Sequence, residues 1–350
     1  MTNGLQVGYN AMLKPKYRMT ITATLAAAMA VASLSPAFAG GAGSSGGLTL
    51  IEAAGARAAA LGEAVSAAAD DVTAAVYNPA ALSTLTSPQV SFSYLKGIAG
   101  DASGRLHLGQ KNLGLSVSYY SAGSVDIIDG GSPRTVNAET DLAATLGGAF
   151  TRGRIGFGGA VKFLSSQLAE SSRATAYAVD LGVRSEISPR FRVSSALQNL
   201  GTKLKFVDEG DPLPRILRAG AEFEAIHGRA PITLSVETPY FLNEKELRPS
   251  LGAEIRVGPM AFRAGYRMGS AIEGLSLGAG FSAGGLLIDY AFGFVQDLNN
   301  RQRISVGFKF GGANSSREVH APMIQTASTD VSGEPIELRS PIALFNGGQK

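Results

Sequence analysis

The sequence predicts an all-β membrane protein, a 14-stranded antiparallel transmembrane β-barrel with a short helical N-terminal plug in its lumen. Three observations predict this fold. Apolar residues alternate with small or charged ones in segment after segment between residues 89 and 311. The connections between these segments are alternately short and long. A secretion signal precedes them, so we expect the chain to be exported.

Composition excludes several other classes of protein. The chain has 350 residues, 44 glycines, no cysteine and no tryptophan, and its mean hydropathy is +0.11. These values exclude a disulfide framework and a helical membrane protein, and they leave a large β domain open. The net charge of +3 comes from three basic residues before position 40, since as many basic as acidic residues follow it. Nucleic acid is therefore not an expected partner.

Residues 1–39 are expected to be a signal peptide. Basic residues at 14, 16 and 18 precede an apolar run over 21–34, and Ala37-Phe38-Ala39 supplies small residues for cleavage before Gly40. An uncleaved anchor helix is the alternative, because residues 20–39 are nearly long enough to span a bilayer. The signal predicts a location in the outer membrane of a Gram-negative type of cell. An even strand number then predicts that both mature termini are periplasmic.

Residues 40–88 are expected to form a linker and the plug. Residues 40–49 are rich in glycine and serine, as flexible linkers are. Residues 50–85 are rich in alanine and lack strand alternation, which predicts short helical pieces. Asp70 or Asp71 can cap one helix, and Asn78-Pro79 supplies a cap and a first-turn proline for another. Such short helices are unstable alone, so we expect them to lie against the barrel wall.

Residues 89–311 are expected to form the barrel. In one clear segment Met260, Phe262 and Tyr266 share a face, and Arg263 and Arg267 lie on the other. Residues 312–350, rich in serine, proline and glycine, predict a flexible periplasmic tail. The fourteen alternating segments cover residues 89–97, 103–109, 111–121, 139–151, 154–166, 173–187, 190–200, 214–225, 231–240, 247–257, 259–268, 274–284, 285–295 and 302–311.

Connection lengths distinguish this barrel from a soluble β-sandwich, which also has one apolar and one polar face. Short turns near residues 110, 152–153, 188–189, 226–230, 258 and 284–285 alternate with longer loops such as 122–138 and 201–213. Outer-membrane barrels have short periplasmic turns and longer outer loops. Because hydrocarbon cannot pair with backbone N–H and C=O groups, a spanning sheet must close on itself.

Charged side chains on the strands are expected to face the lumen, because an Arg or Lys in mid-bilayer lipid costs about 2–4 kcal/mol. Fourteen strands enclose more space than side chains alone can fill, so we expect the plug to occupy it. The lumen charges either line an ion path or form a paired network that holds the plug, and their mixed signs favour the network. The candidates are Lys162, Asp180, Arg184, Arg218, Glu222, Glu254, Arg256, Arg263, Arg267 and Asp289.

The sequence gives little support for catalysis. His107, His227 and His320 are scattered, cysteine is absent, and no serine lies in a Gly-x-Ser-x-Gly frame near a base. Metal ligation lacks support for the same reason. We therefore expect no enzyme activity, no cofactor and no metal site.

Two stretches carry a family resemblance. Residues 55–64, Asp70-Asp71 and Asn78-Pro79-Ala80 resemble the N-terminal signature of the PorV/PorQ family, which belongs with the FadL-type long-chain fatty acid transporters. Residues 197–201 (LQNLG), 211–214 (DPLP) and 218–220 (RAG) are similar to the middle of that family. The resemblance implies a 14-stranded outer-membrane barrel with a plug. The plug and gate candidates are Gly55, Arg57, Gly62, Asp70, Asp71, Asn78, Pro79 and Ala80.

Three functions remain open. The resemblance implies a barrel that transports or presents hydrophobic compounds across the outer membrane, or alternatively a partner in type IX-like protein secretion. A general diffusion porin is a third possibility. The expected partners are outer-membrane lipid and either hydrophobic small molecules or secreted proteins. For Arg57, Asp70 and Asp71, gating through ion pairs to the wall competes with simple helix capping.

Overall fold

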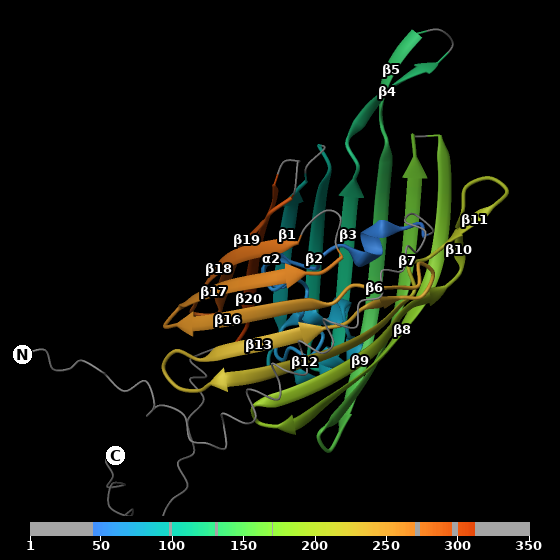
Figure 1. Cartoon of the computed structure of the whole chain (residues 1–350). Helices are drawn as coiled ribbons and strands as arrows, with labels where there is room; N and C mark the ends of the chain where they lie inside the picture. The colour runs from blue at the N-terminus through green and yellow to red at the C-terminus, as the bar shows by residue number, and fades with distance from the viewer. Residues whose placement is uncertain are drawn as a thin grey trace, which may run out of the picture. The chain divides into compact units, whose positions relative to one another are not determined.

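The computed structural model describes residues 45–97, 100–129, 132–169, 171–269, 274–295 and 300–311. The predicted signal peptide, residues 1–39, and the predicted tail, residues 312–350, lie outside the described residues. All described residues belong to one structural unit. Its main feature is a closed antiparallel barrel around a short N-terminal segment (Figure 1).

Fourteen of the described strands close the ring, as predicted. Neighbours along the chain pair in order, and β1 pairs with β20 over eight residue pairs to complete the circle. Strand boundaries fall within three residues of the predicted ones. The ring consists of β1 (Gln89–Lys96), β2 (Ala102–Gln110), β3 (Leu113–Ser121), β6 (Glu139–Arg152), β7 (Ile155–Leu168), β8 (Ser172–Ser188), β9 (Phe191–Gly201), β12 (Ile216–Ile226), β13 (Ile232–Glu237), β16 (Ser250–Val257), β17 (Met260–Arg267), β18 (Leu275–Ala283), β19 (Leu286–Gly293) and β20 (Arg301–Lys309).

Side chains alternate along each strand between an apolar outer face and a small or polar inner face. On β17, Phe262 and Tyr266 are about half exposed, whereas Arg263 between them is buried. This reverses the pattern of a soluble protein, in which large apolar residues avoid the surface. An exposed band of large apolar residues around a closed sheet suits contact with lipid.

Six further strands form three small hairpins within the long connections. They are β4 (Ser124–Asp129) with β5 (Ser132–Asn137), β10 (Lys203–Lys205) with β11 (Gly210–Pro212), and β14 (Tyr240–Phe241) with β15 (Glu246–Leu247). The sequence predicted loops at these hairpins. β10, β11, β14 and β15 have two or three residues each and are too short for a clear period of two, and Pro133 interrupts the β5 segment. Figure 1 shows the β4–β5 hairpin projecting beyond the rim of the ring.

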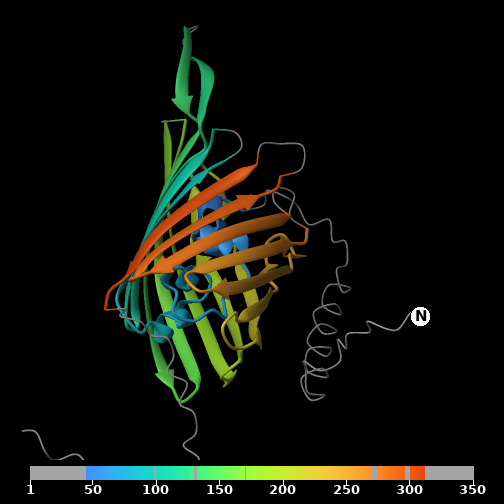
Figure 2. The same ribbon diagram turned by 90° about the vertical axis from the view of Figure 1, so that its left-hand side faces the viewer.

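The N-terminal segment contains four short helical pieces inside the barrel, as Figure 2 shows. They are η1 (Leu48–Ile51), α2 (Ala56–Ala60), η2 (Val72–Val76) and η3 (Pro79–Thr84), of which only α2 is α-helical. The Asp71 carboxylate accepts from the Thr73 N–H at 2.9 Å, and the Asn78 amide oxygen accepts from the Ala80 N–H at 2.9 Å. Both predicted caps therefore begin helical turns. None of the described helices has the length and apolar character needed to cross a membrane.

This plug, residues 45–88, runs along the lumen from one rim to the other. At the long-loop rim the Ser45 hydroxyl donates to Glu244 at 2.6 Å, and the Gly46 N–H donates to the Pro212 carbonyl at 3.0 Å. At the short-turn rim the Phe310 N–H donates to the Pro88 carbonyl at 2.9 Å, just before β1 begins. Ser45 thus lies at the rim opposite the start of β1. The sequence predicts that the mature N-terminus is periplasmic, and this prediction falls on residues before Ser45, which lie outside the described part.

Glycines on the inner face of the wall make room for the plug. A Cβ added at Gly158 would lie 2.3 Å from the Ala80 nitrogen, and one at Gly265 would lie 2.1 Å from the Gly62 nitrogen. Real Cβ atoms do not come that close to backbone, so even a methyl group would displace the plug. These two positions show that plug and wall touch backbone to backbone, on β7 and on β17.

Gly158→Ala should destabilise the barrel by about 1–3 kcal/mol, because its methyl group overpacks against the plug backbone. Gly159→Ala is the matched control, since the only atom near its Cβ is the Asp180 carbonyl oxygen at an ordinary 3.7 Å. Urea titration of the purified barrel in detergent measures both. Equal stability of the two variants would contradict the close contact.

Candidate functional site

The Asn78-Pro79-Ala80 stretch seats the plug on β7, β8 and β9. The Asn78 amide nitrogen donates to the carbonyls of Val183 at 3.0 Å and Ser195 at 3.3 Å, while its oxygen caps η3. Asn78 is fully buried. The Asn78 side chain therefore donates to two backbone carbonyls of the wall and also accepts from the first turn of η3. An amide can do both because its nitrogen carries two donor hydrogens and its oxygen is an acceptor.

The second stretch that carries the family resemblance meets the same part of the plug from the wall. The Gln198 amide donates to the Val76 carbonyl at 2.7 Å and accepts from the Arg218 guanidinium at 2.7 Å. The Arg218 guanidinium also lies over the Tyr77 ring, 5.1 Å from its centroid. The two stretches lie far apart in sequence, yet they form one plug–wall interface.

Arg57 is the centre of the largest ion-pair network. Its guanidinium lies 2.6 Å from the Asp71 carboxylate on the plug and 3.1 Å from Glu254 on β16. Glu254 in turn pairs with Arg263 on β17 at 2.6 Å, and Arg263 pairs with Asp289 on β19 at 2.7 Å. Three wall strands are thus tied to the plug through one side chain. Arg256, at the rim, also pairs with Glu254 at 2.6 Å, and its side chain is 57% exposed.

The Asp71 carboxylate is held ionised by this network. Burial alone would raise its pKa, but the Arg57 guanidinium and hydrogen bonds from Thr73 and Arg57 outweigh that effect and lower the pKa to about 2. At neutral pH both partners of the Arg57–Asp71 pair are therefore charged.

Three further ion pairs join plug and wall through partners that the sequence analysis did not single out. Lys309 on β20 pairs with Asp70 at 2.8 Å, Arg301 on β20 pairs with Glu52 at 3.3 Å, and Arg267 on β17 pairs with Glu63. Lys309 and Arg301 lie on the inner face of β20, together with the buried Arg303 and Ser305. Nothing in the sequence around Glu52 or Glu63 indicates that they form ion pairs with the wall, because their partners Arg301 and Arg267 are distant in sequence.

Other candidates lie in the lumen without joining the plug through an ion pair. Lys162 pairs with Asp180 at 2.7 Å within the wall, and Glu222 pairs with Arg192. Arg184 donates to the plug carbonyl of Ala67 at 3.2 Å. Gly55 and Gly62 precede and follow α2, where they pack against Ser305 and against the backbone of Tyr266. Paired charges of both signs support the interpretation of a holding network over that of an ion path.

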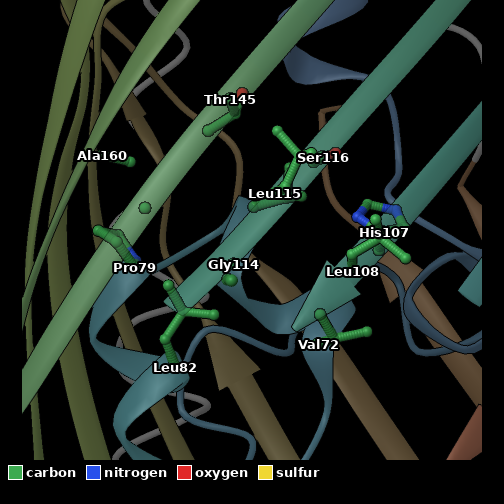
Figure 3. A pocket seen from close by; sticks show the side chains of 13 residues that line it. Val72, Pro79, Leu82, His107, Leu108, Gly114, Leu115, Ser116, Thr145 and Ala160 are labelled. Carbon is green, nitrogen blue, oxygen red and sulfur yellow. The ribbon is translucent and has the colours of Figure 1, made fainter. Parts of the chain in front are cut away.

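A mainly apolar cavity lies between the plug and the wall at β2, β3, β6 and β7 (Figure 3). Its volume is about 20 Å³, which is room for about one water molecule. Its polar side chains are His107, Ser116 and Thr145, and His107 is already hydrogen-bonded to the plug carbonyl of Ala54 at 2.9 Å. The lining residues are Val72, Ala75, Val76, Pro79, Leu82, His107, Leu108, Gly114, Leu115, Ser116, Thr145, Gly147 and Ala160.

The wall beside the cavity is continuous. β3 pairs with β2 and with β6 in unbroken register along its whole length. Register shifts occur between β8 and β9 and between β12 and β13 instead. Within the described residues, no group of three or more His, Cys, Asp and Glu side chains is arranged to hold a metal ion.

Arg57→Met should loosen the plug, because it leaves Asp71 without its nearest cation while keeping the apolar stem. Breaking such a buried pair costs roughly 3 kcal/mol, so amide exchange over residues 56–76 should rise about 100-fold. Arg248→Met is the control, because the Arg248–Glu246 pair is 30% and 26% exposed and contributes at most about 1 kcal/mol. Hydrogen–deuterium exchange with mass spectrometry measures both. Unchanged exchange in Arg57→Met would contradict the network.

Acid should weaken the same contact. The folded-state pKa of Asp71 lies below its ordinary value of 3.8, so its ionised form contributes stability that is present above about pH 4 and lost as the pH falls towards 2. Melting temperatures measured between pH 5 and pH 2 should fall more steeply for the unaltered protein than for Asp71→Asn. Parallel curves would show that Asp71 makes no such contribution.

Comparisons with known proteins place the fold. No protein-family model and no curated protein matches the chain. Solved structures do match: the CymD monoaromatic hydrocarbon channel has a TM-score of 0.51 at 14% identity, over 73% of this chain and 97% of that one. The TodX deltaS2S3 mutant monoaromatic hydrocarbon channel has a TM-score of 0.51 at 13% identity, over 72% and 97%. A Pseudomonas aeruginosa FadL homologue has a TM-score of 0.46 at 12% identity, over 73% and 98%.

At these identities the likeness concerns the fold alone. CymD and TodX are described as monoaromatic hydrocarbon channels, and the resemblance to the PorV/PorQ branch stays a prediction. The chain has a 14-stranded antiparallel barrel with a few short N-terminal helical turns, and it shares the barrel fold with these two structures.

Proposed function

We propose that this protein is an outer-membrane channel for small hydrophobic compounds, without catalysis. The observation that carries the proposal is the apolar cavity between plug and wall. Paired charges such as Lys162–Asp180 occupy other parts of the described lumen, whereas this cavity is lined mostly by aliphatic side chains. The cavity lies next to the helical turns η2 and η3, and a movement of these turns would enlarge it.

The lining of the cavity suits a small apolar molecule. With the plug in its present position the cavity has a volume of about 20 Å³, room for about one water molecule, so the plug must move before a molecule of the size of benzene can enter. Its lining is mostly aliphatic, with a hydroxyl at Ser116 and another at Thr145. Such a site has few groups that would hold a sugar or an ion, and it would favour compounds of low polarity.

The plug gives the cavity a boundary that can move. Leu82 fills the space above Gly114, and Val72 fills the space above Gly109. Both side chains belong to short helical turns, which are only marginally stable without packing. A ligand that displaces Val72 or Leu82 would extend the cavity along the wall without breaking the Arg57 network.

Similarity of fold supports the substrate class. CymD and TodX are described as monoaromatic hydrocarbon channels, and this chain shares their barrel. The proposal includes the predicted signal peptide. It also places the short-turn rim and the tail, residues 312–350, on the periplasmic side. Membership of the PorV/PorQ family and a role in protein secretion stand as alternatives. A plug that spans the lumen disfavours a general diffusion porin.

Ser116→Phe should reduce transport, because its ring would fill the cavity. Intact cells that carry this variant should take up labelled toluene at least about 10-fold more slowly than cells with the unaltered barrel. Val117→Phe is the matched control, because Val117 is the next residue on β3 and does not line the cavity. Short-time uptake at low toluene concentration measures the rates.

Two results would overturn the proposal. One is an uptake by cells with the unaltered barrel that equals that of cells without it. The other is an equal rate for Ser116→Phe and the unaltered protein. Steady ion conductance in planar bilayers would instead indicate a diffusion porin.

A further inference from the structure

Exposed basic side chains that form no ion pair within the described residues lie on one side of the short-turn rim. Lys111 lies in the β2–β3 turn, Arg152 and Arg154 flank the β6–β7 turn, Arg190 lies in the β8–β9 turn and Arg229 lies in the β12–β13 turn. These four turns are consecutive around the barrel. We call these five residues the basic arc.

The basic arc is not neutralised by the protein. Four of the five side chains are exposed, and Arg190 is half-buried. In the described part of the chain none of the five has a carboxylate within ion-pair distance, whereas lumen cations such as Lys162 and Arg263 are paired. Glu186 is the one exposed acidic side chain among the described residues of these turns and the adjoining strand ends. The arc is therefore available to an anionic group outside the chain.

Apolar side chains on the outer face lie close to every part of the arc. Leu113 is 62% exposed beside Lys111, Phe150 is 61% exposed beside Arg152, and Ile226 is 48% exposed beside Arg229. Cations directly beside an exposed apolar band are arranged to meet lipid headgroups while the apolar residues meet acyl chains. The counterion would thus be supplied at the membrane boundary.

The opposite half of the rim lacks this feature. The β16–β17 turn is Gly258-Pro259 and the β18–β19 turn is Gly284-Gly285, and neither carries a charge. Two cations near that half of the rim have partners within the chain, since Lys309 is bound to Asp70 and Arg256 pairs with Glu254 at 2.6 Å. The cations that can meet an external anion therefore lie on one side of the rim.

We propose that the basic arc binds anionic phospholipid headgroups, of the phosphatidylglycerol type, in the leaflet that meets the short-turn rim. The guanidinium groups would donate to phosphate oxygens, the geometry that Arg favours. The inference requires only that the barrel spans a bilayer and is independent of the proposed transport.

The test uses the full chain in phosphatidylethanolamine vesicles that contain traces of spin-labelled lipid. Electron paramagnetic resonance gives the relative association of phosphatidylglycerol and phosphatidylcholine with the barrel. The unaltered protein should prefer phosphatidylglycerol by roughly fivefold at low salt. The preference should approach one in 1 M salt, where charges are screened beyond a few ångström.

Neutralising the arc should abolish the preference. The variant Lys111→Gln, Arg152→Gln, Arg154→Gln, Arg190→Gln, Arg229→Gln should associate equally with both lipids. The control removes five exposed cations from the long-loop side (Lys96, Arg134, Lys203, Lys205 and Lys245, each to Gln) and should keep the preference. Circular dichroism checks that both variants fold.

Three outcomes would overturn the proposal. They are no preference in the unaltered protein, an unchanged preference in the arc variant, and an equal loss in the control. If the unaltered protein lacked the lipid preference yet bound soluble polyglutamate, the arc would serve an acidic protein instead.

Discussion

The cost of an unpaired backbone group in hydrocarbon underlies the whole structure. A sheet that crosses a bilayer must close, since an open edge would leave a row of N–H and C=O groups without partners. Closure by fourteen strands creates a second constraint, because so wide a ring encloses space that side chains from its own wall cannot fill. The plug fills this space. Its sequence is rich in alanine because only small side chains fit in the narrow gap between the plug backbone and the wall.

Plug and wall are matched by two different kinds of contact. Small residues bring backbones together, as at Gly158 and Gly265, where the plug approaches so closely that a methyl group would clash. Ion pairs such as Arg57–Glu254 and Asp70–Lys309 then fix the plug against particular strands. Close packing alone would let the plug slide along the wall. Ion pairs in a poorly solvated lumen oppose such sliding, because it would leave buried charges without partners at a high cost in free energy.

The sequence predicts the wall much better than the contents of the lumen. A period of two is a local signal, and it located all fourteen strands within three residues. The three short hairpins were missed. Segments such as β14, with two residues, are too short to show a period, and Pro133 interrupts the pattern of β5. The pairing of Arg57 with Glu254 could not be predicted, since the two residues are 197 positions apart and neither has a local mark of the other. The same limit applies to the position of Ser45 at the long-loop rim.

The path of the plug also constrains how the barrel can be assembled. The plug precedes β1 in the chain, and the ring is completed only when β1 meets β20. To enter a finished cylinder, the plug would have to slide past the close backbone contacts at Gly158 and Gly265, whereas a plug that lies between the growing strands before the seam joins avoids that passage. Lys309, near the end of the final strand, bonds Asp70 of the plug next to that seam. The internal segment can thus act as a template, and the last hairpin to arrive recognises a surface that is already in place.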